Sequence, residues 1–480
     1  MQISDAPKRS YALLAWIVIL LLCGIQASLV VIRTLGDSTT ISSEDDPVNG
    51  LVVNINEELT GKVIMGLGDF MPDTRPVFLS QSEPLKEGIW RERFAYVILV
   101  GEIEGAEAAL ALIVEEKLLD ETDDVDGDVE SLIETIRLLQ SDRVEEHNDL
   151  PSLNAERREE LKKRAGWMGR LALLHPDTVD QAGRREMIDA LLVIPLVIGI
   201  VGLILGGLGL AGFFGLIVFI VRAFKGRVRH GFRINGSRGG LYAETFACWC
   251  LLFIGSSLVL EFAVDMEGLP DSVETGIGLA IFFLSLLALA WPVFRGVSWK
   301  QVRQDIGWTT NRGVLREVLG GGLAGYAMLL PILGVAVVLV SLLLMLQQMF
   351  FPDAPLPSHP VQGMAASGDP LIIVEMYILA CIAAPLVEET IFRGILYRHL
   401  REASGKWSLV VSVLLSALGS SLIFAALHPQ GLVAIPTLVA LGSGFCFIRE
   451  WRGSLLPSMF AHGFHNFLAI TMITVLFGSG

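Results

Sequence analysis

The chain has 480 residues, of which 52% are hydrophobic and only 18% are charged, with a formal net charge of -15. Globular proteins average about a quarter charged residues, so this composition excludes an ordinary soluble enzyme. The apolar residues are gathered in runs of about 20, the length that crosses the hydrocarbon core of a lipid bilayer. The sequence pI near 5.1 argues against nucleic acid as a partner, because binding phosphates needs clustered basic residues. These features predict a polytopic membrane protein.

The first apolar run, Tyr11 to Ile32, follows a short head that carries Lys8 and Arg9. It is too long for the apolar core of a signal peptide, and no small-residue cleavage site stands out, so we predict a signal anchor helix over residues 1–32. Residues 33–186 are polar, acidic and helical in their periodicity. They are predicted to form a mostly helical extramembrane domain.

Further apolar runs bring the predicted total to about nine spans. The second run, Ile188 to Ile220, is rich in glycine and longer than one span needs, which is typical of close helix packing but also allows a re-entrant hairpin. The remaining runs are Leu241 to Val264, Gly276 to Phe294, Leu319 to Phe350, Leu371 to about Leu400, Trp407 to Leu427, Leu432 to Ile448 and Ser454 to Phe477. The predicted fold is therefore an all-α transmembrane bundle, with accessory helices over residues 187–350 and a second membrane segment over residues 371–477.

Basic residues in the loops indicate the orientation of these spans. They fall on the same side of the membrane as the basic head of the chain, and by the positive-inside rule that side is cytoplasmic. The loop residues are Lys225, Arg227, Arg229, Arg233, Arg238, Arg295, Lys300, Arg303, Arg312, Arg316, Arg398, Arg401, Lys406, Arg449 and Arg452. Residues 33–186 are then predicted to lie outside, and the predicted location is a prokaryotic plasma membrane.

Ionisable residues within apolar helices mark candidate sites, because burying them in a bilayer is costly. Glu388 and Glu389 are adjacent in one apolar run, and Arg393 follows the second of them by four residues. On a helix, Glu389 and Arg393 can therefore pair on one face. Glu388 is turned away from Arg393 and is left available for chemistry.

Two other apolar runs offer histidines. His428 ends one of them, and His462 shares a helix face with Asn466 in the last. A carboxylate and a histidine can activate a water as general base, while a histidine and an asparagine can donate hydrogen bonds to the oxyanion of an attacked amide. Glu388, His428 and His462 would also suit a divalent metal such as Zn2+ with an open position for water. The residues leave both versions open.

Straight helices would place these groups at different depths in the membrane. At 1.5 Å per residue, Glu388 lies roughly 24 Å from a turn near Ser404, whereas His462 lies only about 14 Å above the turn at Arg452. A tilted or short helix before His462 would be needed to bring the groups together.

The motifs Glu-Glu-x-x-x-Arg, Phe-x-x-x-His and His-x-x-x-Asn, in this order, resemble those of the CPBP family of intramembrane proteases. That family includes the CAAX prenyl endopeptidases and the bacteriocin-processing or immunity proteins. The resemblance covers about Leu371 to Phe477. It implies a helical bundle that encloses a cavity, and a membrane-associated protein or peptide as substrate.

The resemblance also implies a role for each motif residue. The implied site consists of Glu388, Glu389, Arg393, His428, His462 and Asn466. Glu388 would be the water-activating base, assisted by His428. His462 and Asn466 would stabilise the oxyanion, and the remaining pair would hold the helix. The family is called metalloprotease, but its motif does not fix whether a metal or a glutamate-activated water does the work.

Two other classes of function stay open at the level of the sequence. A non-catalytic immunity or scaffold protein would use the same residues only to tie the bundle. An ion-coupled transporter would depend on Glu244 or Glu375, which lie in apolar runs with no obvious intramembrane partner.

Overall fold

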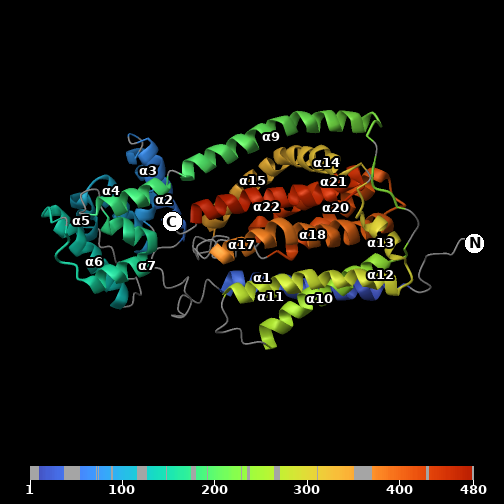
Figure 1. Ribbon diagram of the computed structural model, residues 1–480, viewed down its shortest axis with the longest axis horizontal. Coiled ribbons are helices and arrows are strands. Elements are labelled where there is room, and N and C mark those ends of the chain that lie inside the picture. The colour runs from blue at the N-terminus through green and yellow to red at the C-terminus, as the bar shows by residue number, and fades with distance from the viewer. Residues whose placement is uncertain are drawn as a thin grey trace, which may run out of the picture. The chain divides into compact units, whose positions relative to one another are not determined.

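A computed structural model of the chain describes its backbone over most of the sequence (Figure 1). The described residues are 10–36, 55–71, 73, 75–87, 90–115, 127–147, 149–174, 180–191, 193–228, 230–234, 238–263, 271–310, 312–350, 370–428 and 432–477. Helices joined by turns and loops, with no strand, make up the structure over these residues, and the predicted all-α fold is confirmed.

The chain divides into two compact units. The membrane unit comprises residues 1–41, 202–364 and 369–471, and the helical unit comprises residues 42–201, 365–368 and 472–480.

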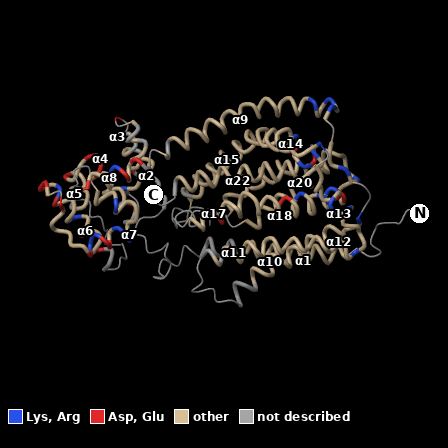
Figure 2. The backbone as a smooth tube through the Cα atoms, in the orientation of Figure 1, with Lys and Arg blue, Asp and Glu red and all other residues tan. Residues whose placement is uncertain are grey.

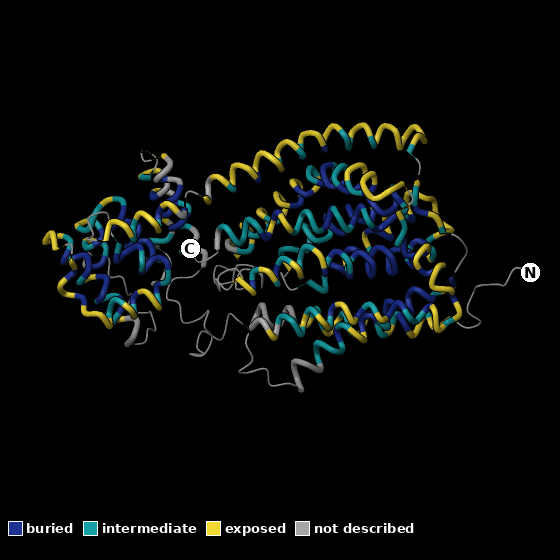
Figure 3. Tube along the Cα trace, in the orientation of Figure 1, coloured by how far each residue is buried: buried dark blue, intermediate teal, exposed yellow. Residues whose placement is uncertain are grey.

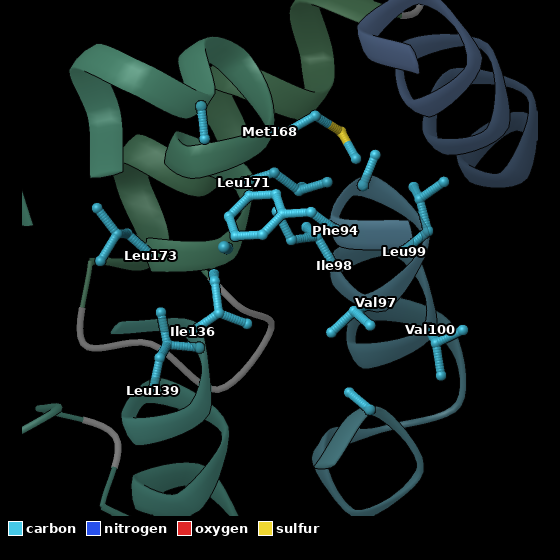
Figure 4. Close-up of a cluster of buried hydrophobic side chains, with 14 of the residues drawn as sticks. Phe94, Val97, Ile98, Leu99, Val100, Ile136, Leu139, Met168, Leu171 and Leu173 are labelled. Carbon is cyan, nitrogen blue, oxygen red and sulfur yellow. The ribbon is translucent and has the colours of Figure 1, made fainter. Parts of the chain in front are cut away.

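The helical unit is built from short helices around its own hydrophobic core. The helices are α2 (Ile55–Phe70), α3 (Arg75–Gln81), η2 (Glu83–Glu87), α4 (Trp90–Ile103), α5 (Ala106–Glu115), α6 (Gly127–Val144), α7 (Ala155–Leu173) and α8 (Gln181–Leu191). Figure 4 shows Phe94 and Ile98 of α4 packed toward Ile136 of α6 and Leu171 of α7, and all four side chains are buried. Burial of this apolar surface stabilises a unit that is otherwise polar.

The helices of the membrane unit include most of the long apolar ones, together with shorter helical segments. They are α1 (Ala12–Gly36), α9 (Val193–Phe224), α10 (Leu241–Ala263), α11 (Asp271–Leu284), η3 (Ser285–Leu289), α12 (Ala290–Phe294), α13 (Trp299–Ile306), α14 (Val314–Glu317), η4 (Val318–Leu323), α15 (Ala324–Phe350), α17 (Pro370–Ile378), η5 (Leu379–Ala383), α18 (Ala384–Glu388), η6 (Glu389–Leu396), α19 (Tyr397–Ala403), α20 (Leu409–Ala426), η7 (Leu432–Ala434), α21 (Ile435–Arg452) and α22 (Leu456–Phe477). In Figure 2 the basic residues of this unit gather at one end, around α12 and α13 and at the C-terminal end of α9.

Eight stretches of helix within the described residues are long and apolar enough to cross a membrane, one fewer than the sequence predicts. They are Ala12–Leu29, Leu196–Phe224, Leu241–Leu258, Thr275–Phe294, Val314–Gln347, Pro370–Ala403, Leu409–Ala426 and Leu432–Arg452. The difference is α22, whose polar residues His462, His465 and Asn466 lower its hydropathy. The chain is a multi-pass membrane protein.

The structure decides whether the glycine-rich run is a single span or a re-entrant hairpin. It forms a single helix, α9, with no break between Val193 and Phe224, so it is not a re-entrant hairpin. Most of α9 is exposed along its length (Figure 3), whereas every residue of η6 is buried. Gly212 of α9 lies directly against the Ala327 carbonyl of α15, where a side chain would clash with the backbone. Small residues let the two helix backbones approach closely there.

The helical path from Pro370 to Ala403 is interrupted by two π-helical segments, η5 and η6. Pro385 lies two residues after the end of η5, and it has no backbone N–H to donate. A widened turn before a proline relieves the clash between its ring and the preceding turn, and π-bulges of this kind are frequent at functional sites. The path ends at Ser404, as the sequence predicts, and α20 returns from an N-cap at Ser408.

Candidate active site

The two adjacent carboxylates lie where α18 meets η6. Glu388 is the last residue of α18, and its side chain is 15% exposed. Glu389 is the first residue of η6, and its side chain is fully buried. Neighbouring residues on a helix point in directions about 100° apart, so the two carboxylates enter different surroundings.

Glu389 is held by two cationic or donor groups. Its Oε1 lies 2.9 Å from Arg393 Nη1 and 3.1 Å from His462 Nδ1. The predicted ion pair between Glu389 and Arg393 is therefore present. The Arg393 guanidinium lies over the Phe424 ring at 4.6 Å and over the Phe445 ring at 5.1 Å. Cation–π contacts with two rings stabilise a charge that is almost completely buried.

Glu388 faces both histidines. Its Oε2 lies 4.0 Å from His428 Nε2 and 3.8 Å from His462 Nε2. The Oε2 atom is buried and has no hydrogen-bond partner among the described residues. Both distances exceed the range of a direct hydrogen bond, so a hydrogen-bonded link between these groups would have to run through a bridging water.

The other nitrogen of each imidazole is already engaged. His428 Nδ1 lies 2.7 Å from the Phe424 carbonyl, which can only accept, so this nitrogen carries a proton. His462 Nδ1 is engaged by Glu389, and the His462 ring stacks on Phe445 with centroids 5.0 Å apart. These contacts fix both rings with their Nε2 atoms toward Glu388.

Asn466 makes a different contact from the one that the sequence suggests. Its Nδ2 donates to the Ala380 carbonyl over 2.7 Å. Ala380 lies in η5, so the amide holds the irregular turn that precedes the Glu388 helix. The structure therefore brings Glu388, Glu389, Arg393, His428 and His462 into one cluster and places Asn466 on the backbone beside it. The role of Asn466 as an oxyanion donor stays a prediction.

A comparison with protein families agrees with this cluster. Residues 370–468 match the family model of type II CAAX prenyl endopeptidase Rce1-like proteins. This segment is similar to the CAAX protease family. The matched residues include both carboxylates and both histidines of the cluster, and the resemblance seen in the sequence is confirmed. Searches of curated proteins and of solved structures find no match to the chain.

Glu388, His428 and His462 are the donor set that the sequence offers to a metal ion. In the part of the chain that the structure describes, no group of three His, Cys, Asp or Glu side chains is arranged to hold a metal ion. Zinc with bonds of about 2.1 Å to tetrahedral ligands places its donor atoms roughly 3.4 Å apart. Glu388 Oε2 lies farther than this from both imidazoles, at 3.8 and 4.0 Å. The residues do not fit a preformed zinc site.

Some residues that support this cluster carry no signal in the sequence. Phe445, which stacks on His462, is one apolar residue in an apolar run. Trp308 donates from Nε1 to Thr390 Oγ1 over 2.9 Å and so anchors the residue after Glu389. Their contacts join segments far apart in the chain, which no local pattern reveals.

The expectation that Glu244 lacks a partner is wrong. Its Oε1 accepts a hydrogen bond from the backbone N–H of Tyr11 at 2.8 Å. Its Oε2 accepts from Trp291 Nε1 at 3.0 Å and lies 3.3 Å from Arg295 Nε. These partners lie in segments distant from Glu244 in the chain, so the sequence gives no indication of them. Both oxygens of Glu244 are therefore engaged in contacts within the bundle. These contacts explain the buried carboxylate without a role in transport.

Proposed function

We propose that the chain is an intramembrane endopeptidase that hydrolyses a peptide bond of a membrane-associated protein or peptide. The observation that carries the proposal is the position of Glu388 Oε2, which faces the Nε2 atoms of His428 and His462 at 4.0 and 3.8 Å. A water that bridges these groups would be within reach of a base and beside a polarising imidazole.

In the proposed reaction, Glu388 takes a proton from this water while His428 orients it through Nε2. The resulting hydroxide attacks the carbonyl carbon of the scissile amide and forms a tetrahedral oxyanion. Glu388 then returns the proton to the leaving nitrogen as the C–N bond breaks. A single carboxylate thus serves as base and then as acid, and the overall reaction consumes one water.

His462 is the proposed donor to the oxyanion. In its imidazolium form it carries hydrogen on both nitrogens, so Nε2 can donate to the oxyanion while Nδ1 stays on Glu389. Glu389 is then shared between two cations, His462 and Arg393, which offsets the cost of burying charge within the bundle. Asn466 has a second amide hydrogen beyond the one it gives to Ala380, and this hydrogen is the proposed second donor.

The proposed setting is a prokaryotic plasma membrane with residues 33–186 outside. The description of the matching family is type II CAAX prenyl endopeptidase Rce1-like, which suggests a lipid-anchored substrate. The proposal for this chain is the broader class of membrane-associated proteins and peptides, because the site groups act on the amide and not on the lipid.

The test compares the membrane proteomes of cells that carry wild-type protein, a null allele and Glu388→Gln. Glu388→Gln keeps the size of the side chain and removes the base, so the same uncleaved proteins should accumulate as in the null strain. Glu375→Gln is the matched control, since Glu375 lies in α17 of the same helical path. Cells with this variant should process their proteins as wild-type cells do.

Two outcomes would redirect the proposal. The first case is a null strain that differs from wild type while Glu388→Gln protein, present at normal levels, fully restores the wild-type state. The bundle then acts as an immunity or scaffold protein. If Glu375→Gln and not Glu388→Gln causes the defect, an ion-coupled function is favoured.

A further inference from the structure

The N-terminal helix α1 packs as part of the membrane unit. It runs beside α10 in Figure 1, and its Ala15 and Ile19 side chains are buried in the same hydrophobic cluster as residues of α10. The opposite face of α1 is open, with Leu13 and Leu20 exposed. A helix that served only to anchor the chain in lipid would not need a buried face of this kind.

The start of α1 is held by a buried carboxylate. Glu244 of α10 is 4% exposed and receives the Tyr11 backbone N–H, which is one of the free donors at the beginning of a helix. Arg295, which pairs with the same carboxylate, also lies over the Tyr11 ring at 5.1 Å. Hydrogen bonds to a charged acceptor are stronger than neutral ones, so this cluster fixes the depth of α1 against α10.

A second contact joins α1 to the helix that carries the site. Trp16 donates from Nε1 to His399 Nε2 over 3.3 Å, with ring centroids 5.8 Å apart. His399 lies in α19, which follows η6 without a break. It therefore lies roughly 15 Å beyond Glu389 along the same helical path. Any shift of α1 acts on the end of this path.

Farther along α1, Cys23 packs against the hydrophobic cluster that contains Cys250 of α10. This pair gives a native position at which docking of α1 can be measured.

We infer that α1 is a fixed component of the protease bundle, docked through Glu244, and that Trp16 acts through His399 as a positioning residue for the helix that bears Glu388 and Glu389. The second half of this inference rests on the proposed function. The first half, docking, is independent of it.

Docking is tested by oxidative cross-linking of the full chain. Cys248, Cys381 and Cys446 are changed to Ser, and a protease site is inserted between positions 40 and 50. Copper phenanthroline should then join Cys23 to Cys250, so that the two fragments stay linked after cleavage, and Cys23→Ser should abolish the link. Glu244→Ala should slow cross-linking about tenfold, since it removes the charged acceptor of the Tyr11 N–H and the partner that holds Arg295 beside the Tyr11 ring. Absence of the link in the parent protein, or an unchanged rate in Glu244→Ala, overturns the docking.

Positioning is tested by the rate at which the proteins that accumulate in Glu388→Gln cells are processed. Trp16→Phe keeps the ring and removes the N–H, and should slow processing about fivefold, the value of one neutral hydrogen bond. His399→Leu should match this loss, and His399→Gln should recover it, because the glutamine oxygen can accept from Trp16. Trp407→Phe is the control, since Trp407 is an exposed tryptophan away from this contact. Wild-type rates in Trp16→Phe, or no recovery in His399→Gln, overturn the positioning role.

If Glu388→Gln changes no processing, the proposed function fails, and the contact is judged by stability alone. The thermal unfolding of detergent-solubilised Trp16→Phe, His399→Leu and the double variant then forms a double-mutant cycle. A double variant no less stable than the worse single variant supports the Trp16 to His399 link, and additive losses overturn it.

Discussion

His462 lies between the two adjacent carboxylates and gives each a different role. Its Nδ1 is 3.1 Å from Glu389 Oε1, and its Nε2 is 3.8 Å from Glu388 Oε2. Glu389 is thus committed to hydrogen bonding and ion pairing within the bundle. Glu388, which is partly exposed and lacks such ties, is the carboxylate left to react.

The pair of Glu389 and Arg393 gives the first prediction. Removing one partner of a buried pair strands a charge, at a cost of about 3–5 kcal/mol. We expect Arg393→Met to lower the thermal stability of detergent-solubilised protein more than the Glu389→Gln and Arg393→Met changes combined. Glu388→Gln should melt as wild type, because this carboxylate has no ion pair closer than 3.8 Å. A combined variant no better than the worse single one would contradict the pairing.

Asn466 gives the second prediction. Asn466→Ala leaves the Ala380 carbonyl of η5 without its donor, so stability should fall by about 1–3 kcal/mol. Loss of an oxyanion donor alone would instead reduce the rate about 10²- to 10³-fold with no change in stability. We expect both effects, measured as the unfolding temperature in detergent and the rate of substrate processing.

Thr471→Val is the matched control for Asn466. It removes the contact of Thr471 Oγ1 with Tyr377 Oη, 3.1 Å away between the same two helical paths. Stability should fall, while the rate should stay near that of wild type. A control as inactive as Asn466→Ala would show that loosening α22 is enough to explain the loss.

The parts of the site that the sequence predicts are those set by local geometry. Glu389 and Arg393 are one helical turn apart, so their pairing follows from their spacing. The depth of His462 does not, because straight helices leave it well short of Glu388. The π-helical turns η5 and η6 change the rise and direction of the Glu388 path, and no residue pattern specifies their position.

Contacts between distant segments set a second limit on prediction from sequence. Glu244 looks isolated in its apolar run, yet its partners lie at Tyr11, Trp291 and Arg295. The continuous helix α9 could not be told from a hairpin, because glycine suits both close packing and tight turns. The number of spans is also sensitive to polar residues, as α22 shows.

Sidedness is the third prediction. Lys163 of α7 and Lys300 of α13 are both exposed, so a cysteine at either position is accessible to reagent from its own side. Lys163→Cys should react with a membrane-impermeant maleimide in intact cells, and Lys300→Cys only after permeabilisation, as the positive-inside rule requires. Background should be low, because the native cysteines are buried or half-buried. The reverse labelling would place residues 33–186 in the cytoplasm.

Metal dependence is the fourth prediction. Glu388 Oε2 lies 3.8 and 4.0 Å from the two imidazole nitrogens, farther apart than donors on a shared zinc ion. We therefore expect purified protein to carry far less than one equivalent of zinc, and its cleavage activity to survive exhaustive dialysis against a chelator. Metal content is read by mass spectrometry of the same sample whose activity is measured. One equivalent of zinc that is lost in His428→Ala and His462→Ala but kept in His465→Ala would instead establish a metal centre, since His465 lies on the same helix and contacts Tyr326 rather than Glu388.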